Sequence, residues 1–113
     1  MNILLVHPYW PYPYSRGEFT YNRIWPPLCL ANCAALLERE GHKVRILDAN
    51  AQRIKPDRLA RNIEGYNKIF ITSSTLDKWQ CPNIDITPFL QTVLKIRELT
   101  DEVYCMEYNR LHL

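Results

Sequence analysis

The chain has 113 residues, of which 47% are hydrophobic and 23% are charged, and its net charge is +2. These figures are typical of a single folded domain, here residues 1–113, and exclude disordered and fibrous chains. Basic residues form no run, so we expect no nucleic-acid partner. The apolar run near the start is too short to be a signal peptide or to cross a membrane, so we expect a cytoplasmic protein whose four cysteines are reduced thiols.

The apolar pattern predicts four strands that alternate with three helices. Residues 3–6 are all apolar, which is typical of a central parallel strand buried on both faces. Prolines that suit a first helical turn precede each predicted helix, and glycines end the first two. In chain order we expect a strand at 3–6, a helix at 28–40, a strand at 42–48, a short helix after Pro56, a strand at 68–72, a helix after Pro88 and a strand at 103–106.

The side chains of two helices lead to expectations about burial. Apolar residues cover most of the circumference of the first helix, so we expect it to be deeply buried. The third helix is expected to bury a stripe made of Phe89, Leu90, Val93 and Leu94.

This order of elements predicts an α/β fold with a doubly wound parallel sheet. Ligands of such sheets bind beyond the carboxyl ends of the strands. The common orders use five or six strands. We therefore expect this chain to stop at least one strand and one helix short at its C-terminus, which would leave the fourth strand as an exposed edge open to self-association.

Two segments at the predicted carboxyl edge are candidates for ligand binding. The hydroxyl cluster Thr72, Ser73, Ser74 and Thr75 can bond a polar ligand, or it can cap the strand and solvate a turn. Residues 8–27 hold five prolines and seven aromatic residues. That segment could line a flat ligand, pack against another domain or form a stiff loop over its own sheet. Asp48 ends a strand where a dinucleotide fold holds ribose, yet no Gly-x-Gly-x-x-Gly loop follows the first strand, which argues against a Rossmann cofactor.

Several stretches together resemble one family, the N-terminal cobalamin-binding domain of B12-dependent radical SAM enzymes. The resemblance covers nearly all of residues 2–99. It is carried by Asn2-Ile3-Leu4-Leu5-Val6, Pro27-Leu28-x-Leu30-Ala31, Leu36-Leu37-Glu38-x-x-Gly41-His42-x-Val44, Leu47-Asp48-Ala49-Asn50-Ala51, Thr72-Ser73-Ser74 and Leu76-Asp77-Lys78-Trp79-Gln80-Cys81-Pro82.

The resemblance implies a flavodoxin-like fold that binds cobalamin (B12) at the carboxyl edge of its sheet and is not catalytic alone. The cofactor-binding residues that it suggests are Pro8, Tyr9, Trp10, Thr72, Ser73, Ser74, Thr75 and Glu107. His7 is a candidate axial ligand of the cobalt, although the Asp-x-His-x-x-Gly motif of methionine synthase-type domains is absent. A parent enzyme would perform methyl transfer or radical rearrangement.

The same family places SAM and a [4Fe–4S] cluster in a radical SAM domain that follows, and we expect that domain to be missing from this chain and to be a partner of it. Cys29 and Cys33 have the first spacing of the Cys-x-x-x-Cys-x-x-Cys cluster motif, but Leu36 stands at the third position. The two thiols are better explained as neighbours on a buried helix face.

Two other functions are compatible with parts of the pattern. The N-terminal domain of a GT-B glycosyltransferase also opens with an apolar strand and has a helix that ends in Gly-His-x-Val, but it usually has a Gly-Gly pair where only Gly17 is available. A receiver-like or protein-binding domain lacks support, because His7-Pro8 occupies the place of the paired acids that hold Mg²⁺ in receivers.

Overall fold

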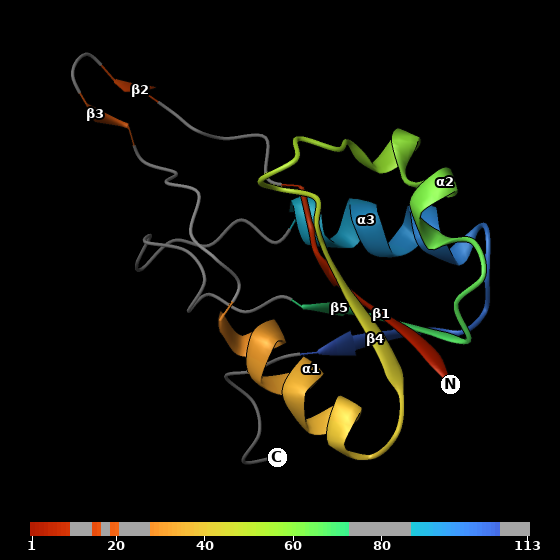
Figure 1. Ribbon diagram of the computed structural model, residues 1–113. Coiled ribbons are helices and arrows are strands. Elements are labelled where there is room, and N and C mark those ends of the chain that lie inside the picture. The colour runs from red at the N-terminus through yellow and green to blue at the C-terminus, as the bar shows by residue number, and fades with distance from the viewer. Residues whose placement is uncertain (10–14, 17–18, 21–27, 73–86, 107–113) are drawn as a thin grey trace.

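The computed structural model describes residues 1–9, 15–16, 19–20, 28–72 and 87–106. Its main element is a four-stranded, all-parallel sheet in the order β4-β1-β5-β6 (Figure 1). The strands are β1 (Asn2–His7), β4 (Lys43–Asp48), β5 (Lys68–Thr72) and β6 (Val103–Met106). This order places the second strand, in chain sequence, beside the first, followed by the third and fourth, as in a flavodoxin-like α/β fold.

Helices cover both faces of this sheet (Figure 1). Helix α1 (Leu28–Arg39) lies on one face. The short 3-10 helix η1 (Pro56–Arg58), helix α2 (Ala60–Ile63) and helix α3 (Thr87–Arg97) lie on the other. Within the described residues, no helix is long and apolar enough to cross a membrane.

Strand β1 is buried on both faces, as its unbroken apolar run predicts. Its pairing with β4 runs from Asn2↔Lys43 to His7↔Asp48, and its pairing with β5 from Ile3↔Lys68 to Val6↔Ile71. Because side chains alternate along a strand, β1 contributes to two cores. Leu4 and Val6 pack with Leu59 and with residues of α2 and α3, while Ile3 and Leu5 pack with α1.

The burial of α1 differs from the sequence expectation. Only Cys29, Leu30 and Ala34 are buried, whereas Leu28 is 68% exposed and Leu36 is 59% exposed. These three buried residues face β1 and β4. The helix is therefore half-covered rather than deeply buried, because the sheet meets one side of it.

The buried stripe of α3 is also rotated from the expected one. Pro88, Phe89, Thr92 and Ile96 are buried, while Leu90 is 45% exposed and Leu94 is 63% exposed. Thr92 enters the core because its hydroxyl donates to the Pro88 carbonyl at 3.0 Å, which satisfies the polar group within the helix. Sequence hydrophobicity alone therefore placed the stripe wrongly at Leu90 and Leu94.

The other element boundaries agree closely with prediction, with one addition. Within residues 8–27, predicted to be a loop, the short strands β2 (Ser15–Arg16) and β3 (Phe19–Thr20) pair antiparallel.

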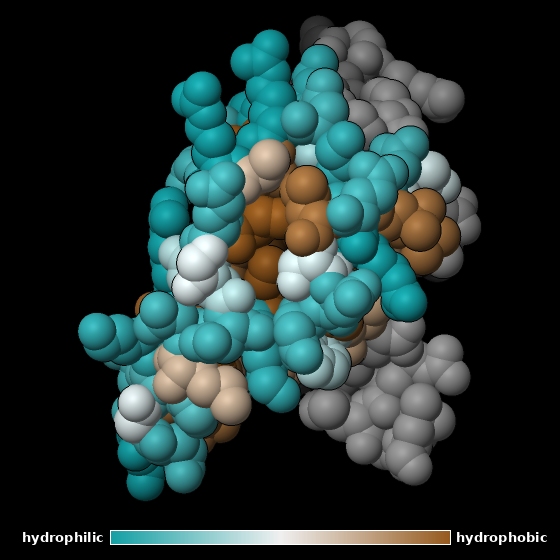
Figure 2. Space-filling view, turned by 90° about the vertical axis from the view of Figure 1, so that its right-hand side faces the viewer, coloured by the Kyte–Doolittle hydropathy of each residue, from teal (hydrophilic) through white to brown (hydrophobic). Residues whose placement is uncertain are grey.

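Figure 2 views the molecule from the side on which β1 begins. Hydrophilic side chains there surround a hollow with an apolar floor. The polar residues that end β1, β4 and β5 lie at the opposite end of the strands.

The orientation of α3 can be tested by truncating two of its side chains. Ile96→Ala is expected to lower the free energy of unfolding by about 2–5 kcal/mol, because it leaves a cavity at a fully buried position. Leu94→Ala, at an exposed position of the same helix, is expected to change it by less than about 0.5 kcal/mol. Urea unfolding measures both, and equal losses would contradict the orientation.

Candidate functional site at the carboxyl edge of the sheet

Three strands bring polar residues together at the carboxyl edge of the sheet. β1 ends at His7, β4 at Asp48 and β5 at Thr72. The chain leaves β1 toward β4 on one side and later returns to β5 on the other side, so the strand order reverses at β1 and β5. Ligands of open α/β sheets bind at such a reversal. His7 and Thr72 flank it, and both are almost fully buried.

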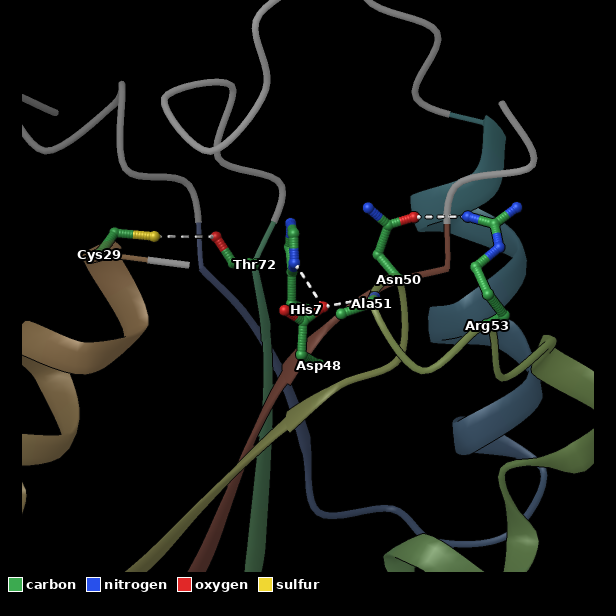
Figure 3. A network of polar contacts seen from close by, with 7 residues as sticks. All are labelled: His7, Cys29, Asp48, Asn50, Ala51, Arg53 and Thr72. Atoms are coloured by element: carbon green, nitrogen blue, oxygen red, sulfur yellow. Dashed lines mark hydrogen bonds and ion pairs between the residues drawn. The ribbon is translucent and has the colours of Figure 1, made fainter. Parts of the chain in front are cut away.

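His7 and Asp48 form the central contact of this edge. Their strands place them directly opposite each other, and His7 Nδ1 lies 3.0 Å from Asp48 Oδ1 (Figure 3). The imidazole is 1% exposed and the Asp48 side chain is 19% exposed. Asp48 Oδ1 also accepts the backbone N–H of Ala51 at 2.9 Å. One carboxylate oxygen thus links the end of β1 to the turn that follows β4.

The contact with Asp48 bears on which ring nitrogen of His7 carries the proton. A carboxylate next to Nδ1 favours the tautomer with its proton on Nδ1, which leaves the lone pair on Nε2. In Figure 3 the second ring nitrogen points away from Asp48, toward the side on which the strands end. The arrangement suits an imidazole that donates its Nε2 lone pair, either to a metal ion or to a proton.

The turn after β4 has a defined backbone. Gln52 N–H donates to the Asp48 carbonyl at 3.0 Å, and Ile54 N–H donates to the Ala49 carbonyl at 2.8 Å. Arg53 has a φ of 56°, in the left-handed region that a residue with a side chain adopts at a cost. Held strain of this kind is often found at functional sites.

The Arg53 side chain connects this turn to Tyr9, which follows the end of β1. Its guanidinium donates to Asn50 Oδ1 at 3.2 Å and to the Tyr9 hydroxyl at 3.1 Å, and its Cζ lies 4.5 Å from the centre of the Tyr9 ring. Asn50 is 2% exposed. Tyr9 is half-buried and packs against the core cluster to which α3 contributes Phe89 and Ile96. Arg53 therefore holds Tyr9, two residues beyond His7, in a fixed place.

Helix α1, which lies on the opposite face of the sheet from α3, contacts Thr72. Its hydroxyl lies 3.9 Å from the Cys29 thiol in the first turn of α1, and both residues are buried. One turn later on the same helix, burial raises the pKa of the Cys33 thiol. Cys33 therefore favours the neutral thiol state, and both cysteines pack in the core between α1 and the sheet, as the spacing of Cys29 and Cys33 predicts.

The structure describes four of the residues that the sequence marks as candidates. His7, Pro8, Tyr9 and Thr72 lie at the carboxyl edge, with Pro8 buried. Trp10, Ser73, Ser74, Thr75 and Glu107 lie outside the described residues. In the described part of the chain, no three His, Cys, Asp or Glu residues form a group that could hold a metal ion by themselves.

The sequence reasoning missed the partners that hold the candidate residues. Asp48 was considered only for ribose binding, and Asn50 and Arg53 were not considered as site residues. Asp48 could have been found, because two parallel strands that both end in a polar residue bring those residues to one edge. Arg53 gave no such signal, since its role depends on the backbone of the turn.

Comparison of the chain with protein-family models, with curated proteins and with solved structures gave no significant match in any of the three.

The role of Asp48 can be tested by removing its carboxylate. Asp48→Ala is expected to lower the free energy of unfolding by about 1–3 kcal/mol, because the buried His7 Nδ1 and the Ala51 N–H both lose their acceptor. Asp57→Ala, in exposed η1, is the matched control and should change it by less than about 0.5 kcal/mol. Denaturant unfolding at pH 7 measures both, and similar values would argue against a structural coupling.

The left-handed backbone at Arg53 can be tested by comparing glycine with alanine. Both substitutions remove the contacts to Tyr9 and Asn50, but only glycine adopts a φ of 56° without strain. Arg53→Gly should therefore be more stable than Arg53→Ala by about 1–2 kcal/mol. At Gln91, an exposed position inside α3, the order should reverse, with glycine about 0.5–1 kcal/mol less stable than alanine. The same order at both positions would contradict the left-handed turn.

Proposed function

We propose that this chain is a cobalamin-binding module of a B12-dependent radical SAM enzyme, in which the cofactor lies at the carboxyl edge of the sheet. The observation that carries the proposal is the His7–Asp48 pair beside the reversal of strand order. The sequence resemblance supports it independently, and the flavodoxin-like strand order fits it. The module itself is not catalytic in this proposal.

The His7–Asp48 pair has the chemistry of an oriented metal ligand. Histidines that bind metals usually give their other ring N–H to a carboxylate or a carbonyl, which fixes the ring and raises the basicity of the ligating nitrogen. Asp48 stands in that position toward His7 Nδ1. In this proposal His7 Nε2 is the lower axial ligand of the cobalt, and Asp48 orients the imidazole.

The donor set fits a metal that is already held by a macrocycle. The cobalt of cobalamin is already held by its macrocycle, so one donor from the protein would be enough to hold it. His7 supplies an imidazole of this kind. Since His7 is 1% exposed, cofactor binding must displace the protein atoms that now cover its ring. Cobalamin, when bound, would supply the methyl-transfer or radical chemistry of the parent enzyme.

The remaining candidate residues would contact the cofactor around this axial position. Thr72 ends β5 beside the reversal, and Ser73, Ser74 and Thr75 follow it in the sequence. In the proposal these hydroxyls bond the polar periphery of cobalamin, with Pro8, Tyr9, Trp10 and Glu107 as further contacts. SAM and the [4Fe–4S] cluster belong to a separate radical SAM domain, which is the proposed partner. The cytoplasm is the proposed location, where Cys29, Cys33 and Cys105 would stay reduced.

One observation favours a second candidate, the N-terminal domain of a GT-B glycosyltransferase. A buried histidine oriented by a carboxylate is also the arrangement of a general base, because the aspartate stabilises the imidazolium that forms when Nε2 takes a proton. In that case His7 would deprotonate an acceptor hydroxyl. The two candidates differ in ligand, so binding separates them.

The proposal can be tested by titration with hydroxocobalamin. The chain should shift the corrin absorbance and retain the cofactor after desalting. His7→Ala should change the spectrum of the bound form and weaken binding, and Asp48→Asn should weaken it about 10–100-fold, the usual effect of losing the partner of a metal-bound histidine. His42→Ala is the matched control, because His42 lies at the amino end of the sheet, 3.4 Å from the N-terminal amine.

Two outcomes would count against cobalamin binding. The first is an unchanged corrin spectrum with a chain whose circular dichroism shows it to be folded. The second is equal binding by His7→Ala and by the unaltered chain, which would remove His7 as the axial ligand. Binding of a nucleoside diphosphate by the same sample, measured by calorimetry, would favour the glycosyltransferase candidate.

A further inference from the structure

A pocket of about 360 Å³ opens at the amino end of the sheet, beside the edge strand β4. Its lining includes Asn2 of β1, Lys43 and Arg45 of β4, and Glu64, Gly65 and Tyr66 from the turn after α2. A pocket of this volume can hold a small ligand. The polar residues of the candidate site end the same strands at the opposite edge, so this pocket is separate from that site.

Two cationic side chains of β4 lie on the same side of the sheet. Side chains alternate along a strand, so Lys43 and Arg45 share the face of Leu47, which belongs to the core on the side of α2 and α3. Lys43, Arg45 and Glu64 are all exposed. Among the residues that the structure describes, none of these three forms an ion pair. The pocket therefore presents two positive charges and one negative charge to a ligand.

Hydrogen bonds hold the turn after α2 against β1. Asn67 N–H donates to the Asn2 carbonyl at 2.7 Å, and Asn2 N–H donates to Asn67 Oδ1 at 2.8 Å. Within the turn, Gly65 has a φ of 85°, and a Cβ at this position would meet no atom within 4 Å. The turn thus leaves open space at Gly65, and the pairing of Asn2 with Asn67 fixes the place of this wall of the pocket.

Tyr66 gives the pocket an aromatic wall. The side chain is half-buried and packs in part against the core. Its hydroxyl accepts a hydrogen bond from Arg45 Nη1 at 3.4 Å. This bond uses one of the five N–H groups of the guanidinium and leaves the others for a ligand. An aromatic ring beside two cations suits a ligand that combines a flat ring with negative charge.

We propose that this pocket binds a small phosphomonoester that carries an aromatic or heterocyclic ring. A phosphoryl group has three terminal oxygens, so Arg45 can bond it at two points while the Lys43 ammonium bonds it at a third. A carboxylate has two oxygens, which a single guanidinium occupies, so the presence of both cations favours the phosphoryl group.

The charge and the ring of such a ligand both match the pocket. A phosphomonoester carries a charge of about −1.5 to −2 at pH 7, which balances the charges of Lys43 and Arg45. Its organic part finds a stacking surface in the Tyr66 ring. Glu64 opposes the negative charge of the ligand, so it limits the affinity in this proposal.

The experiment titrates the unaltered chain with phenyl phosphate, inorganic phosphate and benzoate, without cobalamin, so its outcome is independent of the proposed function. Phenyl phosphate should bind more tightly than inorganic phosphate, because it adds the contact with Tyr66. It should also bind more tightly than benzoate, because it adds the phosphoryl contacts. In NMR spectra of the backbone amides, the largest shifts should fall on residues 43–45 and 64–66.

Substitutions test the role of each charge. Lys43→Met should raise the dissociation constant of phenyl phosphate about tenfold or more, since it removes a charged hydrogen-bond donor. Arg45→Lys should also raise it about tenfold, because it keeps the charge but loses the two-point contact. Glu64→Gln should lower it, because the opposing charge is gone. Lys55→Met is the matched control, since it removes an exposed lysine that does not line the pocket, and should leave binding unchanged.

Four results would overturn the proposal. The absence of saturable binding of phenyl phosphate by a chain that circular dichroism shows to be folded removes the site. Amide shifts centred on His7 and Thr72 place binding at the carboxyl edge instead. Equal binding of benzoate and phenyl phosphate excludes recognition of the phosphoryl group. Binding that is unaffected by both Lys43→Met and Arg45→Lys excludes the two cations as its basis.

Discussion

The parallel pairing of β1 with both β4 and β5 is the constraint on which the rest of the structure depends. It buries β1 on both faces and gives Leu4 and Val6 to one core and Ile3 and Leu5 to the other. The same register sets His7 opposite Asp48. A slip of one residue would exchange the two faces of β1 and separate this pair, so the hydrophobic cores and the polar edge specify each other.

Much of the fold follows from the sequence because its signals are local. Apolar runs and the prolines and glycines around them place the sheet strands and helices close to their observed bounds. The side of each helix that faces the core does not follow from the sequence, because it depends on where the sheet lies. Leu94 points to solvent and Thr92 to the core, since Thr92 can satisfy its hydroxyl on the Pro88 carbonyl. Hydrophobicity alone assigns these two residues the other way.

The candidate site also contains some residues that the sequence predicts and others that it does not. His7 and Thr72 could be predicted, since both are polar residues that end apolar strands. The Asp48 contact needs the register of two strands, and the Arg53 contact needs a left-handed backbone that no sequence pattern announces. These unpredicted residues hold the predicted ones in place. Asp48 orients His7, and Arg53 fixes Tyr9, so the edge is preorganised by residues of the turn after β4.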